Sequence, residues 1–431
     1  MNSNKSHVKT TLNLSEWSEK AVKDIAEIVG GGTPSTKISE YWNGNIPWIT
    51  PKDLSMQQRK YICKGLRNIT IDGLNKSSAK IIPPNSIILS TRAPIGYIAI
   101  SKRDITTNQG CHSLIPSDRT DTEFLYYLIL NNVNYLKSQS NGSTFGELSA
   151  KVLSELEFAL PNLKEQKAIA KILSDLDSKI ELNERMNKTL EDIAQAIFKH
   201  WFIDFEFPNE EGKPYRSSGG EMVDSELGKI PKGWKISCLG AEGTLKNGVN
   251  YLREDRGDTE LYIINVRNIA NSRLLLKYNL DRINIDYDKA KNYFLKENDI
   301  IIARSGIPGE ASLVVGNLED VIYSGFSIRY RLNIPTNRYY VFSSLQRLKK
   351  HLSNYSIGTS LESINQETLK NMKFIIPSHN LLERFNRISL KILERIYNNI
   401  IENYSLINIR DLLLPKLMTG KIRVPLEDEH E

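Results

Sequence analysis

Basic and amide side chains stand in turn-rich stretches of both halves of the chain. Arg and Lys can bind guanine O6 and N7 in the major groove of DNA, Asn and Gln can bind adenine N6 and N7, and others of such a set only hold phosphates. The alternative for each residue is an ordinary surface position in a loop. The candidates for DNA contact are Lys52, Arg92, Asn108, Gln109, Arg267, Asn268, Arg304 and Gln366.

Motifs for catalysis are missing from the sequence. The Gly30–Pro34 turn, GGGTP, lacks the Gly-Lys-Ser/Thr ending of a phosphate-binding loop, and no GxGxxG opens a helix after a strand. The six histidines form no HxxxH or HxH pair, and no GxSxG elbow is present. His200 in FKHWF is expected to pack beside Trp201. We therefore expect no catalytic residue, no metal and no cofactor in this chain.

Composition limits the class of protein. The 431 residues exceed one ordinary domain, and the net charge of +6, from 57 basic and 51 acidic residues, requires any DNA-facing surface to gather its positive charge locally. No apolar run approaches the ~20 residues of a membrane span, and the first twenty residues lack the apolar core of a secretory signal. We expect a cytoplasmic protein. Cys63, Cys111 and Cys238 show no metal-ligand spacing and indicate no disulfide framework.

A long amphipathic helix is predicted from Pro161 to about Phe205, and the chain contains it twice. A shift of 216 residues places Pro161 on Pro377 and Asn183 on Asn399 without a gap. A buried asparagine in a helix seam costs stability and fixes register, so two copies suggest helices that pair; a frayed, solvated turn is the alternative. Each helix would be a spacer of ~60 Å. The expected pairing residues are Ile172, Leu176, Asn183, Leu190, Ile388, Ile392, Asn399 and Leu406.

The stretches before the two helices are predicted to be α+β domains. Strand-like runs at 46–50, 85–100 and 112–116 are bounded by Gly, Pro and Asn, and a helix is expected at 121–138. The second stretch repeats the first in outline: Trp234 answers Trp17, 267–268 answers 52–53, and we place Arg304 opposite Arg92. The expected division is a loosely ordered segment 1–20, domain 21–160, helix 161–207, linker 208–233, domain 234–376, helix with C-terminal segment 377–424, and acidic tail 425–431.

This arrangement resembles the specificity subunit of type I restriction-modification systems. The resemblance covers nearly the whole chain and rests on LPNLKEQKAIAKIL after GSTFGEL, on IPSHNLLERFNRIS after GTSLESI, and on the C-terminal LLLPKLMTGKIRV. Leu381 and Leu382 depart from the pattern, because Glu165 and Gln166 stand there in the first copy. The resemblance implies two target-recognition domains in tandem, with a pseudo-twofold internal repeat and an antiparallel coiled-coil spacer.

The resemblance also implies a function and partners. Each recognition domain would read one half of a bipartite, asymmetric site in double-stranded DNA, and the helices would hold two methyltransferase subunits. Two motor-nuclease subunits would complete the complex, and S-adenosylmethionine, ATP and Mg would be bound by those partners. The chain itself, without an Asn/Asp-Pro-Pro-Tyr/Phe motif or a Gly-Lys-Thr motor loop, would contribute specificity only.

Two other functions stay open at the level of sequence. A stand-alone nuclease or methyltransferase would act on DNA with Mg²⁺ and S-adenosylmethionine in the absence of partners. A coiled-coil adaptor would bind proteins and no DNA, although such an adaptor has no need of two β-rich domains with different loops.

Overall fold

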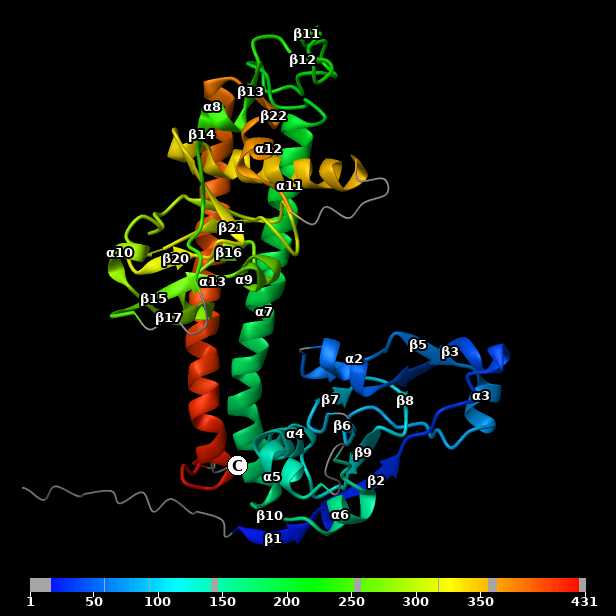
Figure 1. The fold of residues 1–431 in the computed structure, drawn as a ribbon. Helices are drawn as coiled ribbons and strands as arrows, with labels where there is room; N and C mark the ends of the chain where they lie inside the picture. Colours follow the sequence, from blue (N-terminus) through cyan, green and yellow to red (C-terminus); the bar gives the residue numbers. More distant parts are fainter. Residues whose placement is uncertain are drawn as a thin grey trace, which may run out of the picture. The chain divides into compact units, whose positions relative to one another are not determined.

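The computed structural model describes residues 17–57, 59–92, 94–140, 146–251, 257–316, 318–355 and 363–425. The chain divides into two compact units (Figure 1). Unit 1 comprises Met1–Leu182 and Asn403–Glu431, and unit 2 comprises Asn183–Glu402. Each unit therefore contains one recognition-domain stretch of the sequence together with part of each long helix.

Unit 1 begins with short strands and helices and ends in the first long helix. Its order in the chain is β1 (Ser18–Ala21), α1 (Val22–Ile25), β2 (Ala26–Gly30), η1 (Ser39–Tyr41), β3 (Trp42–Ile49), α2 (Pro51–Met56), β4 (Tyr61–Ile62), β5 (Arg67–Ile69), α3 (Ile71–Asn75), β6 (Ile87–Ser90), β7 (Ile98–Ser101), β8 (Thr106–Thr107), β9 (Cys111–Pro116), α4 (Thr122–Asn131), α5 (Val133–Ser138), α6 (Ala150–Glu155), β10 (Glu157–Leu160) and α7 (Leu163–Phe202).

Three sheets organise unit 1. The largest has the order β2-β9-β6-β7-β4, a second has the order β5-β3-β8, and β1 pairs with β10. The central strands β6 and β9 are buried along most of their length because both faces are covered, which explains the apolar run of IILS. Helix α4 packs its Phe124 and Tyr127 into the main core, which also receives Ile169 and Leu173 of α7.

Unit 2 repeats this order with different lengths. Its elements are β11 (Met222–Val223), β12 (Ile230–Pro231), β13 (Lys235–Cys238), α8 (Leu239–Glu242), β14 (Gly243–Asn247), β15 (Thr259–Ile264), α9 (Val266–Asn271), β16 (Leu274–Leu275), η2 (Lys277–Asn279), β17 (Asp281–Ile285), α10 (Tyr287–Ala290), β18 (Ile300–Ala303), β19 (Ala311–Val314), β20 (Val321–Tyr323), β21 (Ser327–Leu332), η3 (Pro335–Asn337), α11 (Arg338–Tyr355), α12 (Gln366–Lys370), β22 (Lys373–Ile376) and α13 (His379–Met418).

The sheets of the two units correspond strand for strand. Unit 2 has sheets β14-β21-β18-β19-β16, β17-β15-β20 and β13-β22, which match the three sheets of unit 1 in order. The directions match as well: β3 and β8 pair in parallel, as do β15 and β20. The internal repeat predicted from the sequence is therefore confirmed as a repeat of fold.

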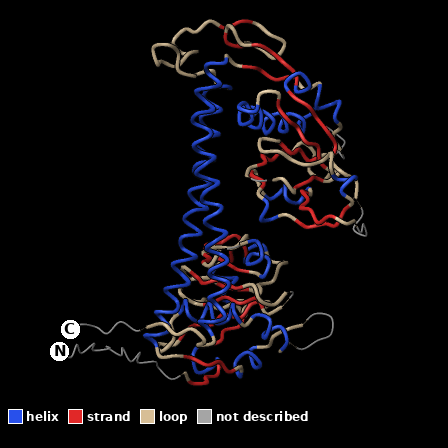
Figure 2. Tube along the Cα trace, turned by 90° about the vertical axis from the view of Figure 1, so that its left-hand side faces the viewer, coloured by secondary structure: helices blue, strands red, loops and turns tan. Residues whose placement is uncertain are grey.

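The two long helices lie side by side (Figure 2), and their sequence colours show that they run antiparallel within each unit (Figure 1). In unit 1, Asn403 Nδ2 of α13 donates to the backbone oxygen of Ile180 on α7. In unit 2, the rings of Phe198 and Phe385 lie 6.1 Å apart. Each helix spans 40 residues. Asn162 Oδ1 accepts from Glu165 N at the start of α7, so the opening proline precedes the cap.

Some expectations for the chain outside the helix pair need correction. Residues 18–20 belong to β1, where β10 supplies their hydrogen bonds, so the N-terminal segment is ordered from Ser18. The helix expected at 121–138 is broken at Asn132, whose φ of −103° and ψ of 12° end α4 and begin α5. The stretch 208–233 contains the β11–β12 hairpin and the buried Ile230. Residues 142–145, 356–362 and 426–431 lie outside the described ranges.

Candidate nucleic-acid interface

A glycine-rich turn forms one side of the candidate edge in unit 1. Gly31 N donates to Cys111 O at 3.3 Å and Gly32 N donates to Thr107 O at 2.8 Å, so the turn lies against the loop between β8 and β9. A Cβ at Gly31 would lie 2.0 Å from Asn108 O. The turn therefore needs glycine for close backbone packing.

The N-terminus of α2 forms the next part of this edge. Thr50 and Asp53 make a reciprocal capping box, in which Asp53 Oδ2 accepts from Thr50 N at 2.8 Å. This cap fixes the exposed Lys52 in the first turn. Asn108 N donates to Ile49 O at 2.9 Å, so Asn108 lies directly beside the entry to α2.

Gln109 and Arg92 belong to the same edge. The exposed Gln109 accepts a hydrogen bond from Thr33 of the glycine-rich turn. Thr91 N donates to Gly110 O at 2.9 Å, which brings the residue after β6 against the same loop. Arg92 forms an ion pair with Glu147, and both side chains are more than 40% exposed, at 44% and 42%. The structure thus brings together all four residues predicted in the first half.

The corresponding edge of unit 2 has the same backbone and other side chains. Asn265 and Asn268 form the capping box of α9 where Thr50 and Asp53 cap α2. Ser324 N donates to Ile264 O at 3.0 Å, as Asn108 N does to Ile49 O. A Cβ at Gly248 would lie 2.2 Å from Ser324 O. The scaffold is repeated, but Ser324 replaces the amide of Asn108.

Arg267 and Asn268 are placed as the repeat predicts, with restrictions. Arg267 occupies the position of Lys52 in the first turn of its helix, and it forms an ion pair with Asp281 of β17. Asn268 Oδ1 accepts from Asn265 N at 2.8 Å, so this oxygen serves the cap. Binding of either side chain to DNA must compete with these intramolecular contacts.

The register that places Arg304 opposite Arg92 is wrong by one residue. Ile364 N donates to Arg304 O at 2.8 Å, as Leu148 N donates to Thr91 O at 3.0 Å. Arg304 therefore corresponds to Thr91, and Ser305 corresponds to Arg92 in the bridge to the following loop. A one-residue slip moves side chains to the other face of a strand, so the two arginines are not equivalent.

Gln366 lies at the start of α12 and faces strand β14. In the amide orientation that satisfies both ends, its nitrogen donates to Leu245 O at 3.1 Å and its oxygen accepts from Asn247 N at 2.9 Å. Both ends of the amide are thus used inside unit 2. This position suits a residue that joins a helix to the sheet better than one that reads bases.

Three of the predicted seam residues are buried in the structure. Asn183 and Asn399 are buried, at 0% and 1% exposure, and Ile392 lies in the core of unit 2. Asn183 Nδ2 donates to Glu402, and Asn399 Nδ2 donates to Asn187, both at 2.8 Å. The remaining predicted side chains of the seam are half-buried: Ile172, Leu176, Leu190 and Leu406.

Ile388 does not belong to the seam. Its side chain is 36% exposed, whereas Phe385 and Ser389 on either side are buried. Ile172, which stands 216 residues earlier, is itself only half-buried, so the buried face passes through the next position in both helices. Ile169 and Leu173 of α7, which stand at the positions of Phe385 and Ser389, are fully buried in the core of unit 1.

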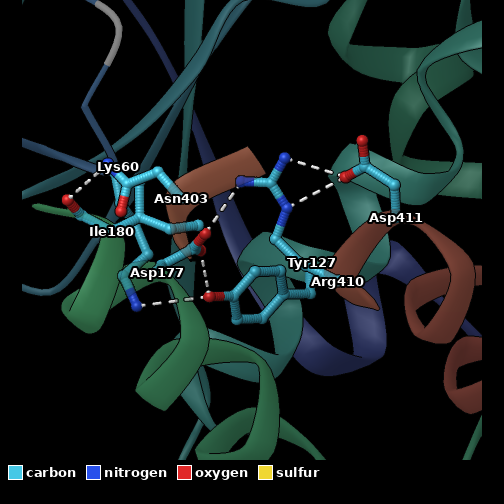
Figure 3. Close-up of polar contacts among 7 residues, drawn as sticks. All are labelled: Lys60, Tyr127, Asp177, Ile180, Asn403, Arg410 and Asp411. Carbon is cyan, nitrogen blue, oxygen red and sulfur yellow. Dashed lines mark hydrogen bonds and ion pairs between the residues drawn. The ribbon is translucent and has the colours of Figure 1, made fainter. Parts of the chain in front are cut away.

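A polar network ties the first recognition domain to the helix pair within unit 1 (Figure 3). Tyr127 of α4 donates to Asp177 of α7, and Arg410 Nη1 of α13 donates to the same carboxylate at 2.8 Å. Lys60 Nζ donates to Tyr127 Oη at 3.4 Å. Burial raises the pKa of the Tyr127 hydroxyl, and the neighbouring Asp177 carboxylate adds to the rise. Tyr127 therefore stays a neutral donor.

The C-terminal segment closes onto the start of α7. Arg423 Nε and Nη2 donate to Glu165 Oε1 and Oε2 at 2.7 and 2.9 Å, a bidentate pair in which the Glu165 side chain is 1% exposed. Trp17 Nε1 donates to the same carboxylate at 3.4 Å. Sequence reasoning missed this cluster, although the exchange of Glu165 for Leu381 between the copies was a signal of it.

The sequence matches the family described as type I restriction modification DNA specificity domain, over residues 14–192 and 231–409. The chain belongs to this family. The two matched stretches each contain one recognition domain and a part of the helix that follows it, so the family's unit is the repeat seen here. The specificity family supplies DNA recognition and no catalysis, in agreement with the resemblance found in the sequence.

Relatives with named functions support the same assignment. The chain is 37% identical over 423 residues to the type I restriction enzyme MjaIX specificity subunit of Methanocaldococcus jannaschii, covering 95% of this chain and 94% of that protein. It is 25% identical to the HindI specificity subunit of Haemophilus influenzae, covering 86% and 89%. A solved S subunit from M. genitalium has the same fold, with a TM-score of 0.57 at 17% identity, over 95% of this chain and 98% of that one.

Two further findings concern the part of the chain that the structure describes. No helix there is long and apolar enough to cross a membrane. Nor does any group of three or more His, Cys, Asp or Glu side chains in these ranges come together as a metal site.

Proposed function

We propose that each recognition domain of this specificity subunit reads one half of a bipartite, asymmetric site in double-stranded DNA. One observation carries the proposal: the same edge is built twice on one backbone but with different side chains. Asn108 and Gln109 in unit 1 correspond to Ser324 and Gly325 in unit 2. Because base recognition depends on side-chain donors and acceptors, one scaffold with two sets of side chains suits two different half-sites.

The long helices complete this proposal. They act as the spacer between the two half-sites and as the docking surface for two methyltransferase subunits, with two motor-nuclease subunits joining for cleavage. S-adenosylmethionine, ATP and Mg are bound by those partners. The relatives named above are specificity subunits of restriction enzymes, which supports assembly with partners of this kind. Such a complex acts on DNA inside the cell, so the place of action is the cytoplasm.

A methylation map tests the proposal. The chain is expressed with its methyltransferase in a host, and methylated adenines are mapped with and without the chain. We expect a bipartite motif with a fixed gap, present only with the chain. Active methyltransferase with no motif, although both proteins are made, would favour the adaptor function; methylation or cleavage by the purified chain alone would favour an enzyme.

Variants at the candidate edge of unit 1 show which half-site the first recognition domain reads. Asn108→Ala with Gln109→Ala should relax one half-site and cost roughly 1–3 kcal/mol for each base that is no longer bound, while the other half-site and the gap stay unchanged. Lys20→Gln, an exposed change on β1, is the control. A change in both halves at once would contradict the assignment of one half-site to each domain.

A further inference from the structure

A groove of about 400 Å³ lies at the β3–β5 side of unit 1. Its lining includes three basic side chains and three amides: Lys64, Arg67, Arg103, Asn43, Asn45 and Asn68. Among the described residues that line it, none is acidic. Lys64, Arg67 and Arg103 are all exposed. This groove was not among the sites predicted from the sequence. The candidate edge of unit 1, called the reading edge below, consists of Lys52, Arg92, Asn108 and Gln109, and none of these residues lines the groove.

The guanidinium of Arg67 is held in place by tryptophan rings. It lies 3.5 Å from the centre of the Trp42 ring and 5.9 Å from that of Trp48, and the two rings meet edge to face at 5.0 Å. Stacking fixes the plane of an arginine and leaves its N–H groups at the rim, where they can bind phosphate oxygens in pairs. Arg67 is therefore oriented before any ligand arrives.

The groove shares its supports with the reading edge. Trp48 Nε1 donates to Gly32 O at 2.9 Å, and Trp42 Nε1 donates to Ser35 O at 3.1 Å, so the tryptophans hold the glycine-rich turn and the residue that follows it. Asp53 Oδ1, from the cap of α2, accepts from Leu66 N at 2.8 Å. DNA that reaches Lys52 and Asn108 thus meets a surface whose backbone is continuous with the groove.

The equivalent side of unit 2 neutralises its own cations. Arg282 Nη1 lies 2.9 Å from Glu260, and Lys277 pairs with Asp320 at 2.5 Å. In the described part of unit 1, by contrast, no ion pair engages the three cations of the groove. An ion-paired cation releases few counterions when DNA binds, whereas an unpaired one neutralises a phosphate directly.

We propose that this groove binds the DNA phosphate backbone next to the half-site read by the first domain, and that unit 1 carries the larger share of the salt-dependent affinity. The inference rests on the proposed function, since it needs DNA at the edge of unit 1. Lys64 and Arg103 supply charge, and Arg67 supplies a bidentate donor. None of the three reads a base, so the recognised sequence does not depend on them.

The test uses the full chain in complex with its methyltransferase, and DNA that carries the mapped motif. Affinity is measured between 50 and 200 mM salt for the wild type and for Lys64→Gln/Arg103→Gln. Each neutralised phosphate contributes about 0.9 to the slope of log affinity against log salt concentration. Without two phosphate-binding charges, the factor by which affinity falls over this range should therefore be roughly ten times smaller than in the wild type. DNA of unrelated sequence should lose affinity equally.

A matched control removes the same charge elsewhere in unit 1. Lys20→Gln/Lys151→Gln changes two exposed lysines on β1 and α6, away from β3 and β5 (Figure 1), and should leave the slope unchanged. Arg67→Lys keeps the charge but removes the stacked fork, so it should lower affinity without altering the slope. This variant also leaves both tryptophans in place.

The outcomes separate the groove from the proposed function. If the wild-type complex binds its motif but the salt dependence of affinity is unchanged in Lys64→Gln/Arg103→Gln, the proposal for the groove is wrong and the proposed function is unaffected. A changed half-site preference in that variant also overturns it, because the residues would then read bases. A wild-type complex without any motif would instead remove the proposed function itself.

Discussion

The two units join their recognition domains to the helix pair by different chemistry. In unit 1 the joint at the end of α13 is polar, with the buried Glu165 carboxylate held by Arg423 and Trp17. Ile422 N donates to Lys416 O as Glu206 N donates to His200 O, so Phe207 in unit 2 occupies the position of Arg423. There, Phe207 stacks on Trp234 with ring centres 5.2 Å apart.

The same contrast holds further along the helices. Asp177 and Arg410 of unit 1 correspond, by the shift of 216 residues, to Leu393 and Ala194 of unit 2, both of which are buried in its core. One fold thus accepts either a hydrogen-bonded charge cluster or an apolar contact at the same place. The difference teaches that the joint must be well packed and must leave no buried polar group without a partner. Its chemistry can change from polar to apolar when all the contacting residues change together.

Breaking the polar joint should have the largest effect. Arg423→Met leaves the Glu165 carboxylate buried without its cation, which should destabilise unit 1 by about 3–5 kcal/mol. Protection of amide hydrogens in the first turns of α7 against exchange measures this destabilisation, and protection around Phe385 in unit 2 provides the internal control.

A double variant turns the joint of unit 1 into that of unit 2. Glu165→Leu/Arg423→Phe introduces the residues found at 381 and 207, so it should recover most of the protection that Arg423→Met removes, to within about 1 kcal/mol of wild type. If the double variant is as unstable as the two single changes added together, the joints are not interchangeable and the comparison fails.

Close packing of the reading edge should give the next largest effect in both units. Gly31→Ala places a Cβ 2.0 Å from Asn108 O, and Gly248→Ala places one 2.2 Å from Ser324 O. Each should cost about 1–3 kcal/mol locally and weaken methylation that depends on its own half-site. Gly30→Ala is the matched control, because nothing lies within 4 Å of its Cβ position. Equal effects at positions 30 and 31 would exclude packing as the cause.

The sequence was sufficient for the parts of the structure that depend on periodicity. The apolar spacing of α7 and α13, the buried Asn183 and Asn399, and the strands around IPWIT and SIILS were all predictable, because each pattern lies within one short segment. The helix at 121–138 was predicted as one piece, since only the backbone angles of Asn132 interrupt it.

Contacts between distant segments could not be predicted in this way. Glu165 and Arg423 are 258 residues apart, and neither stands in a pattern that indicates a partner. The groove of unit 1 depends on the irregular pairing of β3 with β5 between Trp42 and Ile46, which no alternation of residues reveals. A comparison of the two repeats position by position offered the only signal, through the joint exchange of a charged pair for an apolar one.

Acidic pH should destabilise unit 1 more than unit 2. His112 of β9 is buried beside Thr91, with 2.7 Å between Nδ1 and Oγ1, and Ile328 takes its place in unit 2. Burial lowers the pKa of His112; Arg92 lowers it further, whereas Glu147 opposes the shift. The unfolded chain therefore binds the proton first as pH falls below about 6.5, and unfolding becomes easier.

Hydrogen exchange at several pH values checks this prediction. Unit 1 should lose stability below pH 6.5 with a gradient of at most about 1.4 kcal/mol per pH unit from this residue, and His112→Gln should remove that contribution. Unit 2 has no such residue at this register and should not share it. A gradient that persists unchanged in His112→Gln would assign the effect to carboxylates instead.

The smallest effect is expected at the asparagines of the helix seam. Asn399 is buried and donates to the half-buried Asn187, so Asn399→Leu should cost only about 1 kcal/mol, because Asn187 can turn to water. Asn187→Leu/Asn399→Leu removes both partners and should be neutral or stabilising. Hydrogen exchange in α13 measures the stability, and the methylation map reports whether the gap keeps a single length. A stabilised complex whose gap becomes variable would show that these asparagines set the register of the helices. A destabilised double variant with a fixed gap would show that they serve stability alone.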